Sequence, residues 1–145
     1  MADRRPAWRD PFFAACLLAG PTVWALLIVV GVPRPAGHPP LPLLITSVLV
    51  APVLEEWVFR GLLQGWLLER ARLARSRLGL SGANLLTSMT FVAAHLWSRS
   101  APVTAAVLAP SLVLGACRER YGTIWPGVAV HMVWNAGFVW LFAAA

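Results

Sequence analysis

The chain has 145 residues, of which 59% are hydrophobic and 12% are charged, and its mean hydropathy is +0.69. Soluble domains are about one quarter charged, so this composition excludes an ordinary soluble domain and an intrinsically disordered chain. Two cysteines exclude a disulfide framework. A formal charge of +6 would suggest nucleic acid as a partner of a soluble protein. In a membrane protein the excess reports which loops are cytoplasmic, so we expect a lipid bilayer and no nucleic acid.

Apolar stretches alternate with short loops rich in Pro, Gly and Arg, which predicts an all-α polytopic membrane helix bundle. We expect about five transmembrane helices, with short loops between them. The segment 1–40 is predicted to hold an N-terminal tail, the first transmembrane helix and a Pro-rich loop, and 41–145 a single helix bundle. The predicted helices cover 12–32, 41–68, 84–97, 101–117 and 123–144, with a turn at 118–122.

The arginines predict the orientation of the bundle, because cytoplasmic loops retain basic residues. With the N-terminus inside, the outer side receives only Arg34 and Arg99, and Arg60 falls within a helix. The cytoplasmic side then receives nine arginines, which are Arg4, Arg5, Arg9, Arg70, Arg72, Arg75, Arg77, Arg118 and Arg120. This asymmetry predicts a cytoplasmic N-terminus.

A few ionisable residues fall within the apolar stretches, where each charge costs on the order of 2.5–3.5 kcal/mol and therefore needs a reason. Glu56 and Arg60 are four residues apart, so they share a helix face and can neutralise each other. Glu55 is rotated by about 100° from Glu56 and faces elsewhere. The simplest interpretation is a structural ion pair beside a functional carboxylate.

Two further helices carry polar residues at the same spacing of four. His95 follows Phe91 by one turn, and Asn135 follows His131 by one turn. At about 1.5 Å per residue, Glu55, His95 and His131 lie roughly 9–16 Å from the cytoplasmic surface, which predicts one shared site.

One carboxylate, two imidazoles and an amide are suited to activating water. A carboxylate hydrogen-bonded with a histidine can take a proton from water. A second histidine and an asparagine can donate to the oxyanion that forms on an attacked carbonyl. The reaction class that this set permits is peptide-bond hydrolysis without a covalent enzyme intermediate and without a cofactor.

Three sequence runs resemble motifs of the CAAX protease and bacteriocin-processing (CPBP) family, which includes the type II CAAX prenyl endopeptidases. APVLEEWVFRGLL at 51–63 is similar to its EExxxR motif, FVAAH at 91–95 to FxxxH, and HMVWN at 131–135 to HxxxN. The resemblance covers about 41–140 and implies a glutamic-type intramembrane endopeptidase.

The resemblance also implies a role for each residue. Glu55 would be the general base, and His95 would help to hold the attacking water. His131 and Asn135 would form the oxyanion site, while Glu56, Arg60 and Phe91 would be supporting residues. The chain is shorter than eukaryotic CAAX-processing members, which argues against a prenylated substrate. Small bacterial members resemble exosortase- or myxosortase-associated sorting proteases, which implies the bacterial inner membrane and a substrate with a hydrophobic C-terminal segment.

Two alternatives stay open at this stage. Glu55, His95 and His131 are also a plausible set of zinc ligands, which would make the protein a membrane metalloprotease. The chain is alternatively a non-enzymatic member of the family, acting in immunity or as a scaffold. The run GLSG at 79–82 resembles a rhomboid serine protease motif, but Ser81 is better explained as a helix N-cap. His38, in the Pro-rich loop, is interpreted as incidental.

Overall fold

The computed structural model describes residues 6–77, 79–96 and 101–143, which form helices joined by loops and one small hairpin. The chain forms two compact units, 1–54 with 128–145, and 55–127. Both boundaries fall within continuous helices. The all-α prediction is confirmed. The predicted ends of two helices at Trp97 and Ala144, and the arginines Arg4, Arg5 and Arg99 of the orientation argument, lie outside the described residues.

Two helices in the described ranges are long and apolar enough to cross a membrane, Pro11–Val29 and Leu41–Leu68. Both match the predicted positions within a few residues. The count of five spans and the cytoplasmic N-terminus stay predictions.

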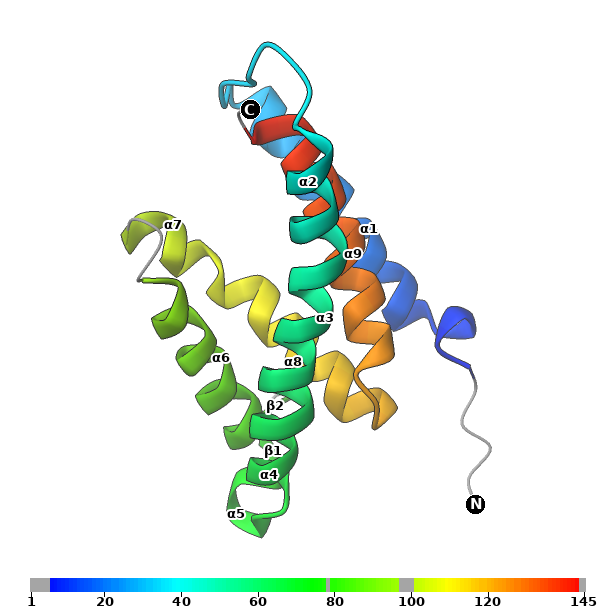
Figure 1. Cartoon of the computed structure of the whole chain (residues 1–145). Coiled ribbons are helices and arrows are strands. Elements are labelled where there is room, and N and C mark those ends of the chain that lie inside the picture. The colour runs from blue at the N-terminus through cyan, green and yellow to red at the C-terminus, as the bar shows by residue number, and fades with distance from the viewer. Residues whose placement is uncertain (1–5, 78, 97–100, 144–145) are drawn as a thin grey trace. The chain divides into compact units, whose positions relative to one another are not determined.

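The first unit contains α1 (Pro11–Val29), the first part of the helix Leu41–Leu68, and most of α9 (Trp125–Phe142). Asp10 caps α1 by accepting from the N–H of Phe12 at 3.0 Å, and Pro11 suits the first helical position. α1 and α9 lie side by side (Figure 1).

Two glycine–tryptophan contacts join α1 to α9. Trp134 of α9 packs against Gly20 of α1, and Trp24 of α1 packs against Gly137 of α9. The Nε1 of Trp134 also donates to the carbonyl of Cys16 at 2.9 Å. A side chain on either glycine would overlap an indole ring, so both glycines are needed for the helices to approach this closely.

The helix Leu41–Leu68 is continuous but not uniform. It is built from α2 (Leu41–Leu44), α3 (Ala51–Glu55) and α4 (Gly65–Leu68), with π-helical segments η2 (Ile45–Val50) and η3 (Glu56–Gln64) between them. In an α-helix the ring of Pro52 would clash with the carbonyl of Val48, and the wider π turn before it relieves that clash. The predicted helix 41–68 is therefore observed, and its hydrogen-bond pattern changes near Pro52 and the acidic pair without ending the helix.

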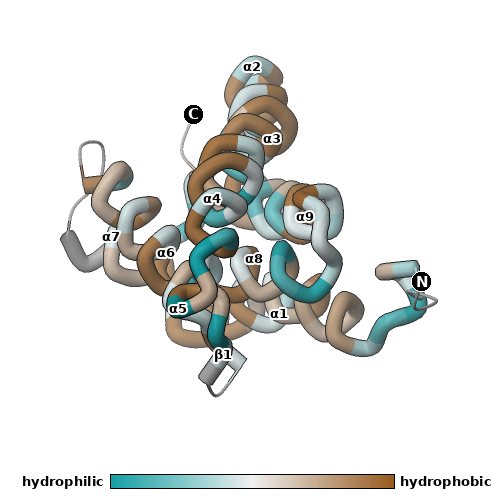
Figure 2. Tube along the Cα trace, turned by 90° about the horizontal axis from the view of Figure 1, so that it is seen from below, coloured by the Kyte–Doolittle hydropathy of each residue, from teal (hydrophilic) through white to brown (hydrophobic). Residues whose placement is uncertain are grey.

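The second unit continues through α5 (Ala71–Ala74) and a hairpin of β1 (Ser76–Arg77) and β2 (Leu80–Ser81), which are antiparallel. It then forms α6 (Gly82–His95), α7 (Ala101–Ala106) and α8 (Leu108–Tyr121). Hydrophilic residues gather on the segment from α5 to β1, whereas the long helices are mostly apolar (Figure 2). Ser81 is the N-cap of α6 and accepts from the N–H of Asn84 at 2.9 Å, which confirms its predicted role.

Two predictions on the fourth helix are wrong. The predicted helix 101–117 is divided at Val107, because Pro110 is tolerated only in the first turn of a new helix. The predicted turn at 118–122 is helical as far as Tyr121, and the chain turns only at Gly122, whose φ of +71° favours glycine.

The two glycine–tryptophan contacts give the first testable prediction. We expect Gly137→Ala to lower the melting temperature of the detergent-solubilised protein, because overpacking costs about 1–3 kcal/mol. The matched control is Gly65→Ala, whose added Cβ would lie 3.8 Å from Nη2 of Arg118, an ordinary contact distance. This control should be neutral or stabilising, since alanine favours helix. A Gly137→Ala protein as stable as Gly65→Ala would contradict the close packing.

Candidate active site

The first element of the site is a buried ion pair on η3. Nη1 of Arg60 lies 3.2 Å from Oε1 of Glu56, and both side chains are 0% exposed. The predicted pairing at a spacing of four is therefore observed. Gly127, at the start of α9, makes room for the carboxylate, because a Cβ there would lie 3.1 Å from Oε2 of Glu56.

Arg60 connects three helices. Its Nη2 donates to the carbonyl of Ser111 at 3.1 Å and to the hydroxyl of Ser111 at 2.9 Å, which ties η3 to α8. Its guanidinium carbon lies 4.5 Å from the centre of the Phe91 ring on α6, a cation–π distance. Phe91 also makes an edge contact with Phe59 of η3, with ring centroids 4.9 Å apart. The arginine therefore holds α6 and α8 against η3.

A second polar contact repeats this arrangement one helical turn further on. The Nε2 of Gln64 donates to the carbonyl of Gly115 at 3.1 Å and to Oε1 of Glu119 at 2.9 Å. The same carboxylate oxygen accepts from the hydroxyl of Ser81 at 2.5 Å. The Nε of Arg118 donates to the carbonyl of Arg60 at 3.1 Å. α8 thus carries several of the polar partners of η3.

Sequence reasoning missed this second contact. It assigned Glu119 to a turn, whereas the residue lies in α8 and bonds Gln64 and Ser81. A signal was present: Glu56, Arg60 and Gln64 recur every four residues, and so do Ser111, Gly115 and Glu119. Matching periods on two helices indicate facing polar stripes, but neither set shows by itself that the other is its partner.

Glu55 differs from its neighbour in exposure. It is the last residue of α3 and is half-buried, whereas Glu56 begins η3 and is fully buried. The rotation of about 100° between successive helical residues accounts for the difference.

His95 is the last residue of α6 and is held by the turn before it. Its Nδ1 lies 2.8 Å from the carbonyl of Phe91, and the two rings are 4.4 Å apart. A carbonyl can only accept, so Nδ1 carries the hydrogen of this bond. The predicted placement of Phe91 and His95 on one helix face is therefore observed.

His131 and Asn135 lie on the part of α9 that belongs to the other unit. Nδ2 of Asn135 donates to the carbonyl of Ser47 at 2.9 Å. Within η2 the N–H of Ala51 bonds to the carbonyl of Thr46, and Pro52 has no N–H to offer to the carbonyl of Ser47. Asn135 therefore donates a hydrogen bond to a carbonyl that has no backbone donor in the π-helical pattern.

The predicted residues are divided between the two units. The structure brings Glu56, Arg60, Phe91 and His95 into one chain of contacts, with Glu55 adjacent to it in sequence. His131, which is 8% exposed, and Asn135 are the group that lies on α9 in the other unit. The meeting of both groups at one cavity stays a prediction.

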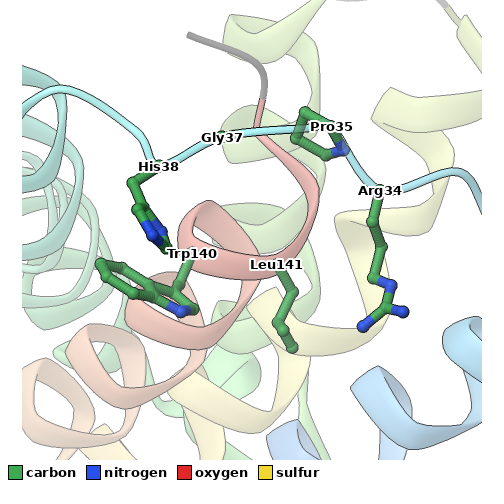
Figure 3. Close-up of a pocket in the computed structure, with 6 residues that line it drawn as sticks. All are labelled: Arg34, Pro35, Gly37, His38, Trp140 and Leu141. Atoms are coloured by element: carbon green, nitrogen blue, oxygen red, sulfur yellow. The ribbon is translucent and has the colours of Figure 1, made fainter.

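A pocket of the first unit is lined by other residues, among them His38 and Trp140. It has a volume of about 480 Å³ and lies between the loop after α1 and the end of α9 (Figure 3). His38 stacks on Trp140 there, with ring centroids 4.9 Å apart and an interplanar angle of 26°. His38 thus packs the loop onto α9, and its interpretation as incidental to function stays a prediction.

Comparison with known proteins identifies the family. Residues 37–137, more than half of the chain, match the family described as type II CAAX prenyl endopeptidase Rce1-like. The chain belongs to this family. The predicted resemblance is thereby confirmed, and the match spans the Glu55–Glu56, Phe91–His95 and His131–Asn135 motifs. No curated protein and no solved structure matches the chain.

Members of the Rce1-like family are integral membrane proteins with CAAX-type protease activity on membrane-anchored protein substrates. Within the ranges that the structure describes, no group of three or more His, Cys, Asp or Glu side chains is arranged to hold a metal ion. The choice between a water-activating and a zinc-binding role for the motif residues is therefore one for experiment.

The buried pair of this Rce1-like protein gives the second prediction. We expect Arg60→Met to lower the free energy of unfolding by about 3–5 kcal/mol, because it leaves the Glu56 charge buried without its counterion. The double variant Glu56→Gln/Arg60→Met should recover part of the loss. Thermal unfolding in detergent measures the stability of the single and of the double variant. Arg9→Met, at an exposed position, is the control. An Arg60→Met protein of wild-type stability would show that the pair does not hold the helices together.

Proposed function

We propose that the protein is a glutamic-type intramembrane endopeptidase with Glu55 as its general base. The observation that carries the proposal is the unequal exposure of two adjacent glutamates. Glu56 is 0% exposed and paired with Arg60, whereas Glu55 is half-buried and can meet water or substrate. Membership of a protease family supports the assignment of a catalytic role to this motif.

In this mechanism Glu55 and His95 activate one water molecule. The carboxylate takes a proton from the water while the oxygen of that water attacks the carbonyl carbon of the scissile peptide. His95 orients the water through Nε2, the nitrogen left as acceptor when Nδ1 bonds to the carbonyl of Phe91. The proton held by Glu55 then passes to the leaving amine as the C–N bond breaks, so the carboxylate is regenerated.

His131 and Asn135 stabilise the oxyanion in this proposal. The amide of Asn135 has two hydrogens on Nδ2, and its bond to the carbonyl of Ser47 needs only one of them. That bond fixes the amide while the second hydrogen is available for the oxyanion. Preorganised donors of this kind stabilise charge that develops in the transition state.

The substrate that fits this proposal is a membrane protein or peptide with a hydrophobic C-terminal segment. A bundle with few intramembrane charges offers mainly apolar surface, on which a hydrophobic segment can lie. We assign the protein to the bacterial inner membrane as a multi-pass protein, with a sorting role that removes C-terminal anchors.

Replacing the general base tests the proposal directly. We expect Glu55→Gln to abolish cleavage, since general-base catalysis contributes about 10²–10⁴-fold, while the protein still accumulates in membranes. The measurement compares the C-termini of membrane proteins from cells that carry wild-type or Glu55→Gln protein. Glu69→Gln, at an exposed position, is the matched control and should cleave normally. Cleaved C-termini that persist with Glu55→Gln would refute the glutamate mechanism.

Chelation separates the glutamate mechanism from the zinc alternative. Cleavage of the substrate found above should be unchanged in isolated membranes treated with EDTA or 1,10-phenanthroline, because the proposed base and oxyanion donors are all side chains. Loss of activity that added Zn²⁺ restores would favour Glu55, His95 and His131 as zinc ligands.

A further inference from the structure

A basic segment follows directly after a helix long enough to span the membrane. Leu41–Leu68 has 28 residues, or roughly 42 Å at 1.5 Å per residue, which exceeds a hydrocarbon core of about 30 Å. Its end therefore reaches the membrane surface, and Arg70, Arg72 and Arg75 lie within seven residues of it. We expect arginines at this position to lie near the phosphate layer of the bilayer.

Arg70 marks the same boundary by its contact with an aromatic side chain. Its guanidinium lies 3.3 Å from the centre of the Trp66 ring and donates to the Trp66 carbonyl. Trp66 is 54% exposed near the end of the helix. Tryptophan and arginine at a helix end are typical of the interface between hydrocarbon and water.

A pocket of about 560 Å³ lies beside this boundary, between α5, the hairpin and the start of α6. None of its six lining residues is acidic, and two are arginines with exposed side chains. Leu80 and Leu85, which are 40% and 45% exposed, form an apolar part of the wall. The lining residues are Arg72, Arg75, Leu80, Ser81, Gly82 and Leu85.

We propose that this pocket binds the headgroup of an anionic phospholipid. The two guanidinium groups suit a phosphate diester, to which arginine donates paired hydrogen bonds. The N-terminus of α6, a 14-residue helix, adds its positive dipole end at Gly82. The leucines distinguish a lipid from a free anion, because an acyl chain can cover them while the phosphate meets the arginines.

Lipid binding here would act on α6 through its cap. Ser81 lines the pocket, caps α6 at the N–H of Asn84 and donates to Glu119 of α8. A phosphate held by Arg72 and Arg75 would lie at the beginning of the helix whose last residue is His95, beside a cap that already bonds the carboxylate of Glu119. The inference concerns binding and holds independently of the catalytic mechanism.

The experiment uses the full chain purified in a neutral detergent. Binding of phosphatidylglycerol and of phosphatidylcholine is titrated by native mass spectrometry and by the shift in melting temperature. We expect Arg72→Gln/Arg75→Gln to weaken phosphatidylglycerol binding about thirtyfold, which corresponds to about 1 kcal/mol per arginine at an anionic lipid surface. Binding of phosphatidylcholine should not change.

Two controls make the result specific. Arg9→Gln/Arg34→Gln removes the same charge at exposed positions outside the pocket and should change phosphatidylglycerol binding less than threefold. Leu80→Ser keeps both arginines. It should weaken the binding of phosphatidylglycerol but leave any binding of inorganic phosphate unchanged. Equal losses in the two double variants would overturn the proposal. So would full competition by millimolar inorganic phosphate, which would indicate a site for free phosphate.

Discussion

The buried pair of Glu56 and Arg60 is the interaction on which the second unit depends. Two charges with no exposed surface are tolerated only when their partners are complete, because each carries a desolvation cost of several kcal/mol. For the charge of Arg60, the partners include Ser111 of α8 and the ring of Phe91 on α6. The helices therefore cannot shift relative to η3 without uncovering a charge. Such a constraint holds the α6 helix that ends at His95 in a fixed register with the glutamate motif.

In the π-helical segments of the long helix, two backbone carbonyls accept hydrogen bonds from side chains of other helices. Arg118 donates to the carbonyl of Arg60 in η3, and Asn135 donates to the carbonyl of Ser47 in η2. In the second case Pro52 explains the need, since it has no N–H to offer. π-helical turns often occur at functional sites, and here both lie in the helix that carries the EExxxR motif. Asn135, the proposed oxyanion donor, thus also holds the backbone of η2 through a hydrogen bond.

Charge is scarce in this chain, and its distribution separates two kinds of role. The buried charges are used for packing and, in our proposal, for hydrolysis, whereas we propose that the arginines beyond Leu68 face the membrane surface. The pocket that Arg72 and Arg75 line combines guanidinium groups, which suit the phosphate of a phospholipid, with exposed leucines, which suit its acyl chain. The excess of positive charge then has a second consequence beyond orientation, because it would tie α6 to the lipid composition of the bilayer.

The sequence by itself determined the helical class, the positions of the two long apolar helices, the ion pair and the family. These follow from local properties: hydropathy over a turn or more, a spacing of four, and motifs within single helices. Only the tertiary structure decided what the polar residues contact. Glu119 was predicted in a turn but bonds Gln64 and Ser81, and His38 packs on Trp140. Such partners are 38 to 102 residues apart, and spacing along one helix carries no information about which side chain on another helix completes a buried polar group.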